Sequence, residues 1–328
     1  MDTDTEQLLR RSLTKVLVDE ADRELSARLA TLGWAEVLDD DAPTAFRALF
    51  EVKGQTAAPG DALGPAMARA AALILQRPEL AGAGVVLPSS LRPDELSSRV
   101  DKGRVAVAGV TGSPPGRAPV LVPVASGDDV AVTIIPAGVE WSVTELSGTD
   151  ASIGLWRVAA EIDQADVELV TGVPARESWA AAVATGRWAL GAELLGVGRH
   201  VVATAVEYAA QRHQYGRPIG SFQAVQHRLA GAHASLVGAG RVVEVAANSG
   251  SPWVATVAKA VAGRAAEMGC TQAQQTFGAI GFTWEHEFHR YLRRTYALDW
   301  LLGDWRSLEV EIGQRLQATR SVPRVGML

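Results

Sequence analysis

The chain has 328 residues and a net charge of −6, so it is long enough to bury a large core in two or three domains. No block of lysines and arginines occurs, which excludes nucleic acid and anionic membranes as expected partners. The single cysteine, Cys270, excludes an internal disulfide and favours a reducing compartment. No apolar run reaches the ~18 residues of a membrane span, and the segment MDTDTEQLLRRSL is charged, so we expect a cytoplasmic protein.

Residues 1–85 are predicted to form a helical domain. The segment DTEQLLRRSLTKVLVDEADRELSARLATLGW (4–34) repeats apolar residues at steps of three and four, which is the period of an amphipathic helix. The segment APGDALGPAMARAAALILQ (58–76) has the same period, interrupted by two Pro and Gly pairs.

Residues 86–172 are predicted to form a β domain. Short β-branched runs alternate here with Gly, Pro, Asp and Ser, a pattern typical of an antiparallel sheet. These runs are RVAVAGV (104–110), APVLVPVA (118–125), VAVTIIPA (130–137), VEWSVTEL (139–146) and LWRVAAEI (155–162).

Residues 173–328 are predicted to form a helical bundle, because the helical period returns and lasts nearly to the end of the chain. The segment LGVGRHV (195–201) lies inside this pattern, so its two glycines indicate close helix packing and not a nucleotide loop. The predicted helices cover residues 175–213, 221–248, 252–275 and 285–303, with a last one to about residue 319.

One corner between two of these helices has an unusual composition. The segment QRHQYGRPIGSFQAVQHRLA (211–230) leaves a helix through Arg212 and Gln214, turns at Gly216 and begins another helix. Such a corner is either a plain helical hairpin or a place where an arginine holds an anion.

This corner closely matches the hallmark Arg-x-x-Phe-Gly-x-x-Ile-x-x-Phe-Gln segment of the acyl-CoA dehydrogenase family, which the chain resembles over nearly its whole length. LGWAEVL (32–38) is similar to the family's N-terminal Leu-Gly-Trp motif, and QQTFGAIGFTWEHEFHRYLRR (274–294) is similar to its Gln-x-Phe-Gly-Gly-x-Gly segment. The resemblance implies an α+β fold, with an N-terminal helical domain, a central antiparallel β domain and a C-terminal four-helix bundle.

The resemblance also implies which residues contact FAD. In this family the hallmark arginine and its neighbours reach across a dimer interface to the FAD of the adjacent subunit. A guanidinium offers a rigid fork of donors that suits two phosphate oxygens, so Arg212 would bind the diphosphate. The other residues implied by the resemblance are Gln214, Tyr215 and Gly216 on the adenosine side, and Gln275 and Gly278 in the second segment. Ala279 replaces the family's second glycine there. The alternative is that Arg212 caps a helix C-terminus and the glycines only close turns.

Family features of the catalytic site are missing from the sequence. The Thr-Glu-Pro and Trp-Ile-Thr segments, which hold the flavin ring within one subunit, are not found in the predicted β domain. In most members of the family the glutamate base directly precedes a glycine after the last segment, and this chain has Leu302 at that position. In other members the base precedes an arginine in the first bundle helix, and this chain has Gly186 there. Neither side chain accepts a proton, so we expect no catalytic base from this chain.

Other acidic and histidine residues nearby give weaker signals. Glu193, Asp299 and Asp304 are candidates for a relocated base, whereas Glu285 and Glu287 are expected to lie at a solvated helix start. His286 and His289 have the i, i+3 spacing of metal ligands, but no third ligand is in reach by sequence, so we expect no metal.

These observations lead to one main hypothesis. The chain resembles the smaller, degenerate subunit of actinobacterial α2β2 steroid-CoA dehydrogenases, of the kind used in steroid and cholesterol degradation. It would contribute contacts to FAD at the interface with a second, catalytically complete subunit, and the substrate would be a bulky acyl-CoA. Two alternatives remain, namely a self-sufficient homo-oligomeric flavoenzyme with a relocated base and a non-redox scaffold or acyl-CoA-binding protein.

Overall fold

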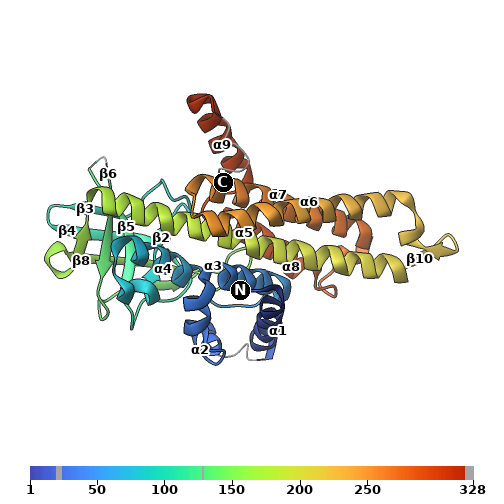
Figure 1. Cartoon of the computed structure of the whole chain (residues 1–328), viewed down its shortest axis with the longest axis horizontal. Helices are drawn as coiled ribbons and strands as arrows, with labels where there is room; N and C mark the ends of the chain where they lie inside the picture. Colours follow the sequence, from blue (N-terminus) through green and yellow to red (C-terminus); the bar gives the residue numbers. More distant parts are fainter. Residues whose placement is uncertain (20–23, 128, 322–328) are drawn as a thin grey trace.

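The computed structural model describes residues 1–19, 24–127 and 129–321. Helices come first, a sheet follows, and helices return, in the order that the sequence predicts (Figure 1). The sheet lies at one end of an elongated molecule and the long helices run away from it to the other end. The N-terminal helices are α1 (Thr3–Asp19), α2 (Leu25–Ala30), α3 (Trp34–Thr56) and α4 (Leu63–Leu75), followed by the 3₁₀ turn η1 (Pro78–Gly82).

Helix α3 contains a kink where its backbone leaves the helical region. Asp41 has φ −156° and ψ 78°, directly before the helix resumes with Pro43 inside it. A proline restricts its neighbours and is favoured in the first turn of a helix, so the second half of α3 starts there as a new helix. The Asp41 carboxylate accepts the Thr44 N–H at 3.2 Å, as an N-cap does.

The five predicted strand runs all form strands, and four shorter strands join them in one sheet. The sheet order is β7-β8-β4-β3-β5-β6-β9, with β1 paired to β5 and β2 to β4. The pairs β1·β5 and β3·β5 are parallel, so the sheet is mixed and not purely antiparallel as predicted. The strands are β1 (Gly84–Val85), β2 (Leu87–Pro88), β3 (Arg99–Asp101), β4 (Arg104–Thr111), β5 (Val120–Ser126), β6 (Asp129–Ile135), β7 (Ser142–Glu145), β8 (Trp156–Asp163) and β9 (Glu168–Val170). The 3₁₀ turns η2 (Ala151–Ile153) and η3 (Gln164–Asp166) lie between the last three strands.

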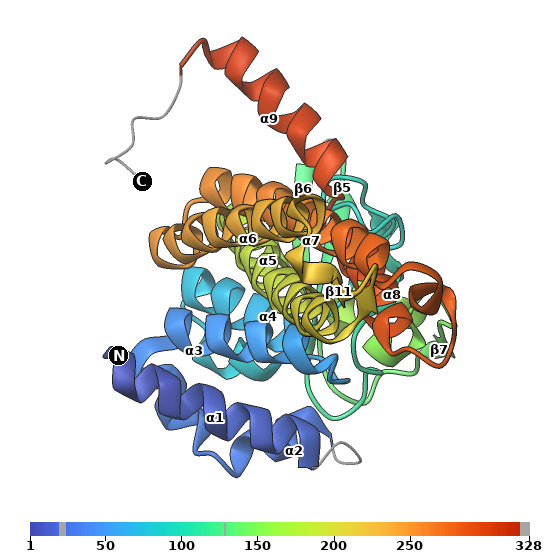
Figure 2. The ribbon, with the colours of Figure 1, turned by 90° about the vertical axis from the view of Figure 1, so that its right-hand side faces the viewer.

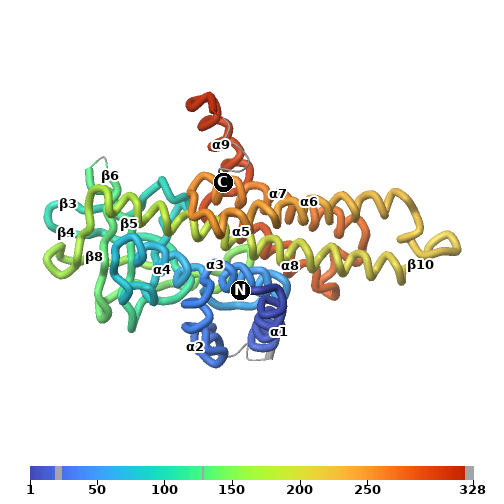
Figure 3. Tube along the Cα trace, viewed as in Figure 1, coloured from blue at the N-terminus to red at the C-terminus, as the bar shows by residue number. Residues whose placement is uncertain are grey.

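The C-terminal part is a bundle built on one long helix. Its elements are α5 (Gly172–Gln211), β10 (His213–Gln214), β11 (Arg217–Pro218), the 3₁₀ turn η4 (Ile219–Ser221), α6 (Gln223–Ser249), α7 (Pro252–Phe277), the 3₁₀ turn η5 (Gly278–Phe282), α8 (Phe288–Trp300) and α9 (Trp305–Thr319). Figure 2, an end-on view, shows α5 enclosed by α3, α4, α6, α7 and α8, while α9 projects from the body. The tube in Figure 3 shows the same path without the ribbon.

The predicted helix at 285–303 is shorter in the structure. Helix α8 begins at Phe288 and ends at Trp300, because Leu301 is extended and Leu302 and Gly303 have positive φ angles of 59° and 101°. A positive φ is strained for a leucine, so this loop is held by its surroundings and not by local preference.

Helix α5 is the one helix among the described residues that is long and apolar enough to cross a membrane, which differs from the expectation from the sequence. It has the length and the hydropathy of a spanning helix, but 72% of its most apolar window is buried inside the structure. Its apolar surface is therefore used as the core of the bundle.

The two halves of the helical structure meet at a close crossing of α3 and α5. A Cβ on Gly54 would overlap the Glu193 carbonyl oxygen, and a Cβ on Gly196 would overlap the Glu51 carbonyl oxygen. The backbones therefore touch directly. This confirms that LGVGRHV indicates close helix packing, and it shows that glycine is required at both positions.

Candidate functional site

The corner after α5 is a small β-hairpin at the far end of the bundle (Figure 1). His213 pairs with Pro218 and Gln214 pairs with Arg217, and the two residues between them have φ angles of 55° and 77°. Two consecutive positive φ angles define the hairpin turn whose twist fits two antiparallel strands. Tyr215 and Gly216 form this turn, and the Tyr215 side chain is 92% exposed.

Arg212 lies at the base of this hairpin with its backbone fixed and its side chain exposed. Its N–H donates to the Tyr208 carbonyl at 2.8 Å, and its carbonyl accepts the Ile219 N–H at 2.7 Å. Among the described residues, the guanidinium has no hydrogen bond or ion pair, so it does not cap the end of α5. Gln214 is exposed in the same hairpin. An unpaired guanidinium on a fixed backbone is well suited to bind an anionic group.

The second predicted segment lies at the same end of the bundle. Phe277, the last residue of α7, packs edge-on against Tyr208 of α5 with ring centroids 5.5 Å apart. Gln275 is exposed, and Gly278 has φ 64° and ψ −136°, a backbone conformation that only glycine adopts readily. The hairpin and the end of α7 therefore present their polar groups on one end of the molecule.

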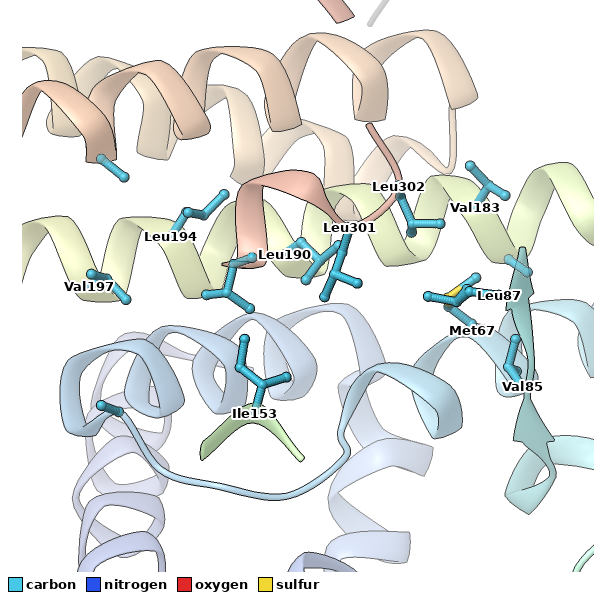
Figure 4. Close-up of a cluster of buried hydrophobic side chains, with 14 of the residues drawn as sticks. Met67, Val85, Leu87, Ile153, Val183, Leu190, Leu194, Val197, Leu301 and Leu302 are labelled. Atoms are coloured by element: carbon cyan, nitrogen blue, oxygen red, sulfur yellow. The ribbon is translucent and has the colours of Figure 1, made fainter. Parts of the chain in front are cut away.

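The two positions at which the family places its base meet in the structure. A Cβ on Gly186 would lie 2.5 Å from Leu302 Cδ1 and 2.9 Å from Met67 Sδ. Leu302 is fully buried, in a cluster of apolar side chains from α4, α5, the sheet and the loop after α8 (Figure 4). No carboxylate from the described residues lies in this apolar contact, so the place is packed core.

Two buried cations hold the loop that contains Leu302. Lys259 Nζ donates to the carbonyls of Asp299 at 2.9 Å and Gly303 at 3.3 Å, and Arg187 Nε donates to the Leu302 carbonyl at 3.2 Å. Burial lowers the pKa of Lys259 to about 8, and the nearby Asp299 carboxylate opposes that shift. These bonds keep the loop in its strained conformation.

The three candidates for a relocated base have structural contacts. Asp299 lies 3.6 Å from Lys259 and accepts the Trp305 N–H at 3.3 Å, and burial raises its pKa. Asp304 accepts the N–H groups of Arg306 and Ser307 and so caps α9. Glu193 lies in the ion cluster described next.

This ion cluster links α3, α5 and α8, and no motif in the sequence predicts it. Glu193 lies 3.8 Å from Lys53 and 3.9 Å from Arg294, and Arg294 Nε lies 3.3 Å from Asp150 Oδ2. Burial lowers the pKa of Lys53 to about 8, and Glu193 opposes that shift. A cavity of only about 40 Å³ lies between this cluster and the apolar side chains that include Met67.

The two histidines with the spacing of metal ligands contact the backbone around the start of α8. His286 Nδ1 accepts the Phe288 N–H at 3.1 Å, and His289 Nδ1 lies 2.9 Å from the His286 carbonyl. Glu285 and Glu287 are exposed, as expected for a helix start. Over the parts of the chain with described coordinates, no group of three or more His, Cys, Asp or Glu residues could hold a metal ion.

Comparison with known proteins gives a consistent result. Residues 178–316 match the family model described as "Acyl-CoA dehydrogenase, C-terminal domain". A curated relative, acyl-CoA dehydrogenase IpdE2 of Mycobacterium tuberculosis, is 36% identical over 129 residues, which are 39% of this chain and 39% of the relative. The chain thus aligns with about two fifths of that protein's length.

Solved structures of low sequence identity share the fold over almost the whole chain. The ChsE4–ChsE5 complex of Mycobacterium tuberculosis superposes with a TM-score of 0.78 at 21% identity, covering 99% of both chains. A variant of the Tcur3481–Tcur3483 steroid ACAD gives a TM-score of 0.77 at 20% identity, covering 97% of this chain and 99% of that one. Residues 178–316 therefore belong to the acyl-CoA dehydrogenase family as its C-terminal domain, and the chain as a whole has the acyl-CoA dehydrogenase fold.

Proposed function

We propose that this chain is the non-catalytic subunit of a heteromeric, FAD-dependent acyl-CoA dehydrogenase that acts on a bulky, steroid-derived CoA thioester. The observation that carries the proposal is the contact between Gly186 and Leu302, the two family positions for the base, inside packed core. The partner would be a second, catalytically complete subunit, and the complex would be cytoplasmic. Both solved complexes are named for two chains, which supports the partner, and one of them is described as a steroid ACAD, which supports the substrate class.

The exposed end of the bundle offers residues that fit FAD, whereas the region around Leu302 and Met67 does not. The cavity of about 40 Å³ beside Met67 and Glu193 is far below the ~300–1,000 Å³ typical of a ligand pocket, so this part of the interior has no room for a flavin ring or an acyl chain. On the exposed end, Arg212 offers an unpaired guanidinium, with Gln214 and Gln275 as neutral donors and acceptors. When bound, FAD supplies hydride acceptance in thioester dehydrogenation. This chain would bind and orient its diphosphate from across the interface.

Two other functions are less well supported. A self-sufficient enzyme would need a free carboxylate near Leu302, whereas Glu193, Asp299 and Asp304 are all engaged in ion pairs or a helix cap. A scaffold without redox function would gain little from an unpaired arginine on a rigid hairpin.

Cofactor loading of the chain alone tests the proposal directly. We expect the chain expressed alone to be colourless or poorly soluble, because its β domain lacks the Thr-Glu-Pro and Trp-Ile-Thr segments that hold the flavin ring within one subunit. The measurement is the absorbance spectrum between 350 and 500 nm (roughly the flavin bands) of the chain alone and with candidate partner subunits. Bright yellow protein with stoichiometric FAD from this chain alone would overturn the proposal.

Amide substitutions test whether a base has moved into this chain. We expect Glu193→Gln, Asp299→Asn and Asp304→Asn to leave turnover of the complex within a few-fold, since a lost general base costs at least ~10². The assay is dehydrogenation of a steroid-type CoA thioester with an artificial electron acceptor, at a temperature where circular dichroism shows each variant folded. A hundredfold loss in one variant that still contains FAD would identify it as the base.

A further inference from the structure

Phe222 forms a fixed platform next to the hairpin. It is the residue before α6, and its carbonyl accepts the N–H groups of Val225 at 3.0 Å and Gln226 at 3.1 Å. Its own N–H donates to the Ile219 carbonyl at 3.1 Å. Its backbone is therefore tied to the helix on one side and to the 3₁₀ turn on the other, which limits where its ring can lie.

The ring of Phe222 contacts the hairpin at its turn and at the start of β11. The guanidinium carbon of Arg217 lies 4.1 Å from the ring centroid, within the distance of a cation–π interaction. Tyr215 meets the same ring edge-on, with centroids 6.2 Å apart and an interplanar angle of 84°. Tyr215 is 92% exposed even beside this ring, and among the described residues Phe222 is the one aromatic ring in contact with it.

The two arginines of the hairpin therefore have different environments. Arg217 rests on an aromatic ring, whereas the Arg212 side chain has no partner among the described residues, although its backbone is hydrogen-bonded on both sides. A guanidinium stacked on a ring keeps its in-plane N–H donors but is fixed in orientation by that ring, whereas the Arg212 guanidinium can turn toward a ligand.

We infer that Phe222 is a positioning residue, which holds Arg217 and Tyr215 on its ring so that Arg212 is the guanidinium presented to a diphosphate. The inference rests on the proposed function and extends it, because it assigns different tasks to two neighbouring arginines. It also predicts that the hairpin is ordered before any ligand binds, which reduces the entropy lost on binding.

The test compares Phe222→Leu with the conservative Phe222→Tyr in the complex with the partner subunit. We expect Phe222→Leu to raise the FAD dissociation constant by about three- to thirtyfold, as expected for loss of a ring that holds a cation, and Phe222→Tyr to restore it. Hydrogen exchange over residues 212–219, measured by mass spectrometry without FAD, should be faster in Phe222→Leu and unchanged in Phe222→Tyr. Arg217→Gln should weaken FAD binding less than Arg212→Ala does.

Each other outcome contradicts one part of the reasoning. Unchanged exchange in Phe222→Leu would show that the ring does not hold the hairpin. Faster exchange in Phe222→Leu with an unchanged FAD dissociation constant would show that an ordered hairpin is not needed for FAD binding. A loss in Arg217→Gln as large as in Arg212→Ala would make Arg217 a diphosphate ligand. If Arg212→Ala itself has no effect, the proposed function fails, and the exchange measurement still decides whether Phe222 holds the hairpin.

Discussion

Arg212→Ala is expected to lower the affinity of the complex for FAD about ten- to a hundredfold, with little change in the stability of this chain. A hydrogen bond to a charged group contributes roughly 1.5–3 kcal/mol, which corresponds to that range of dissociation constants. Stability should hardly change, because the exposed guanidinium has no partner within the described chain. The measurement is FAD titration of the complex by flavin fluorescence, alongside thermal unfolding of the variant.

A matched control separates this contact from general surface charge. Arg228 is also exposed, but it lies on α6 outside the hairpin. Arg228→Ala removes the same charge and should leave the FAD dissociation constant within about twofold, since exposed charges are largely screened at physiological salt. Equal losses in both variants would show a long-range charge effect, and no loss in Arg212→Ala would remove the residue from the FAD site.

Arg294→Met is expected to destabilise the folded chain by about 3–5 kcal/mol, because it leaves Asp150 without its cation and Glu193 with Lys53 alone. Arg294 is fully buried, lies 3.9 Å from Glu193 and 3.3 Å from Asp150, and donates to the Ala58 carbonyl at 2.6 Å. The substitution keeps the apolar stem of the side chain and removes the charge and all of these contacts. Urea unfolding followed by circular dichroism gives the change in the free energy of unfolding.

Arg290→Met is the control for this prediction. Arg290 is on the same helix, α8, but is exposed, so its replacement should change the free energy of unfolding by no more than about 0.5 kcal/mol. A loss below about 1 kcal/mol in Arg294→Met would show that water screens the buried cluster and that the ions are not essential to the fold.

Local patterns predicted most helices and strands of this structure, because the spacing of apolar residues and the turn residues that end an element lie within a few positions of one another. The runs 104–110 and 155–162 became paired strands β4 and β8, and the two glycines of LGVGRHV became close helix contacts. The parallel pairing of β1 with β5 was missed, since a two-residue strand such as Gly84–Val85 has no periodicity to detect. Pairing between distant strands depends on tertiary packing.

The site was predictable only where short motifs mark it. The corner was found from its residues, but its hairpin was not, because Tyr215 occupies a turn position at which glycine or asparagine is the usual signal. The contact between Gly186 and Leu302, and the cluster around Arg294, join residues more than a hundred positions apart. No short window of sequence contains both partners of such a contact.

The glycine crossing of α3 and α5 also limits how this protein can move. Sliding of packed helices requires side chains that can exchange neighbours, but at Gly54 and Gly196 one backbone rests directly on the other. The helices around this crossing should therefore move as one rigid body, with their slowest hydrogen exchange at its centre. Any rearrangement that accompanies assembly with a partner would be confined to elements away from this crossing, such as the projecting helix α9.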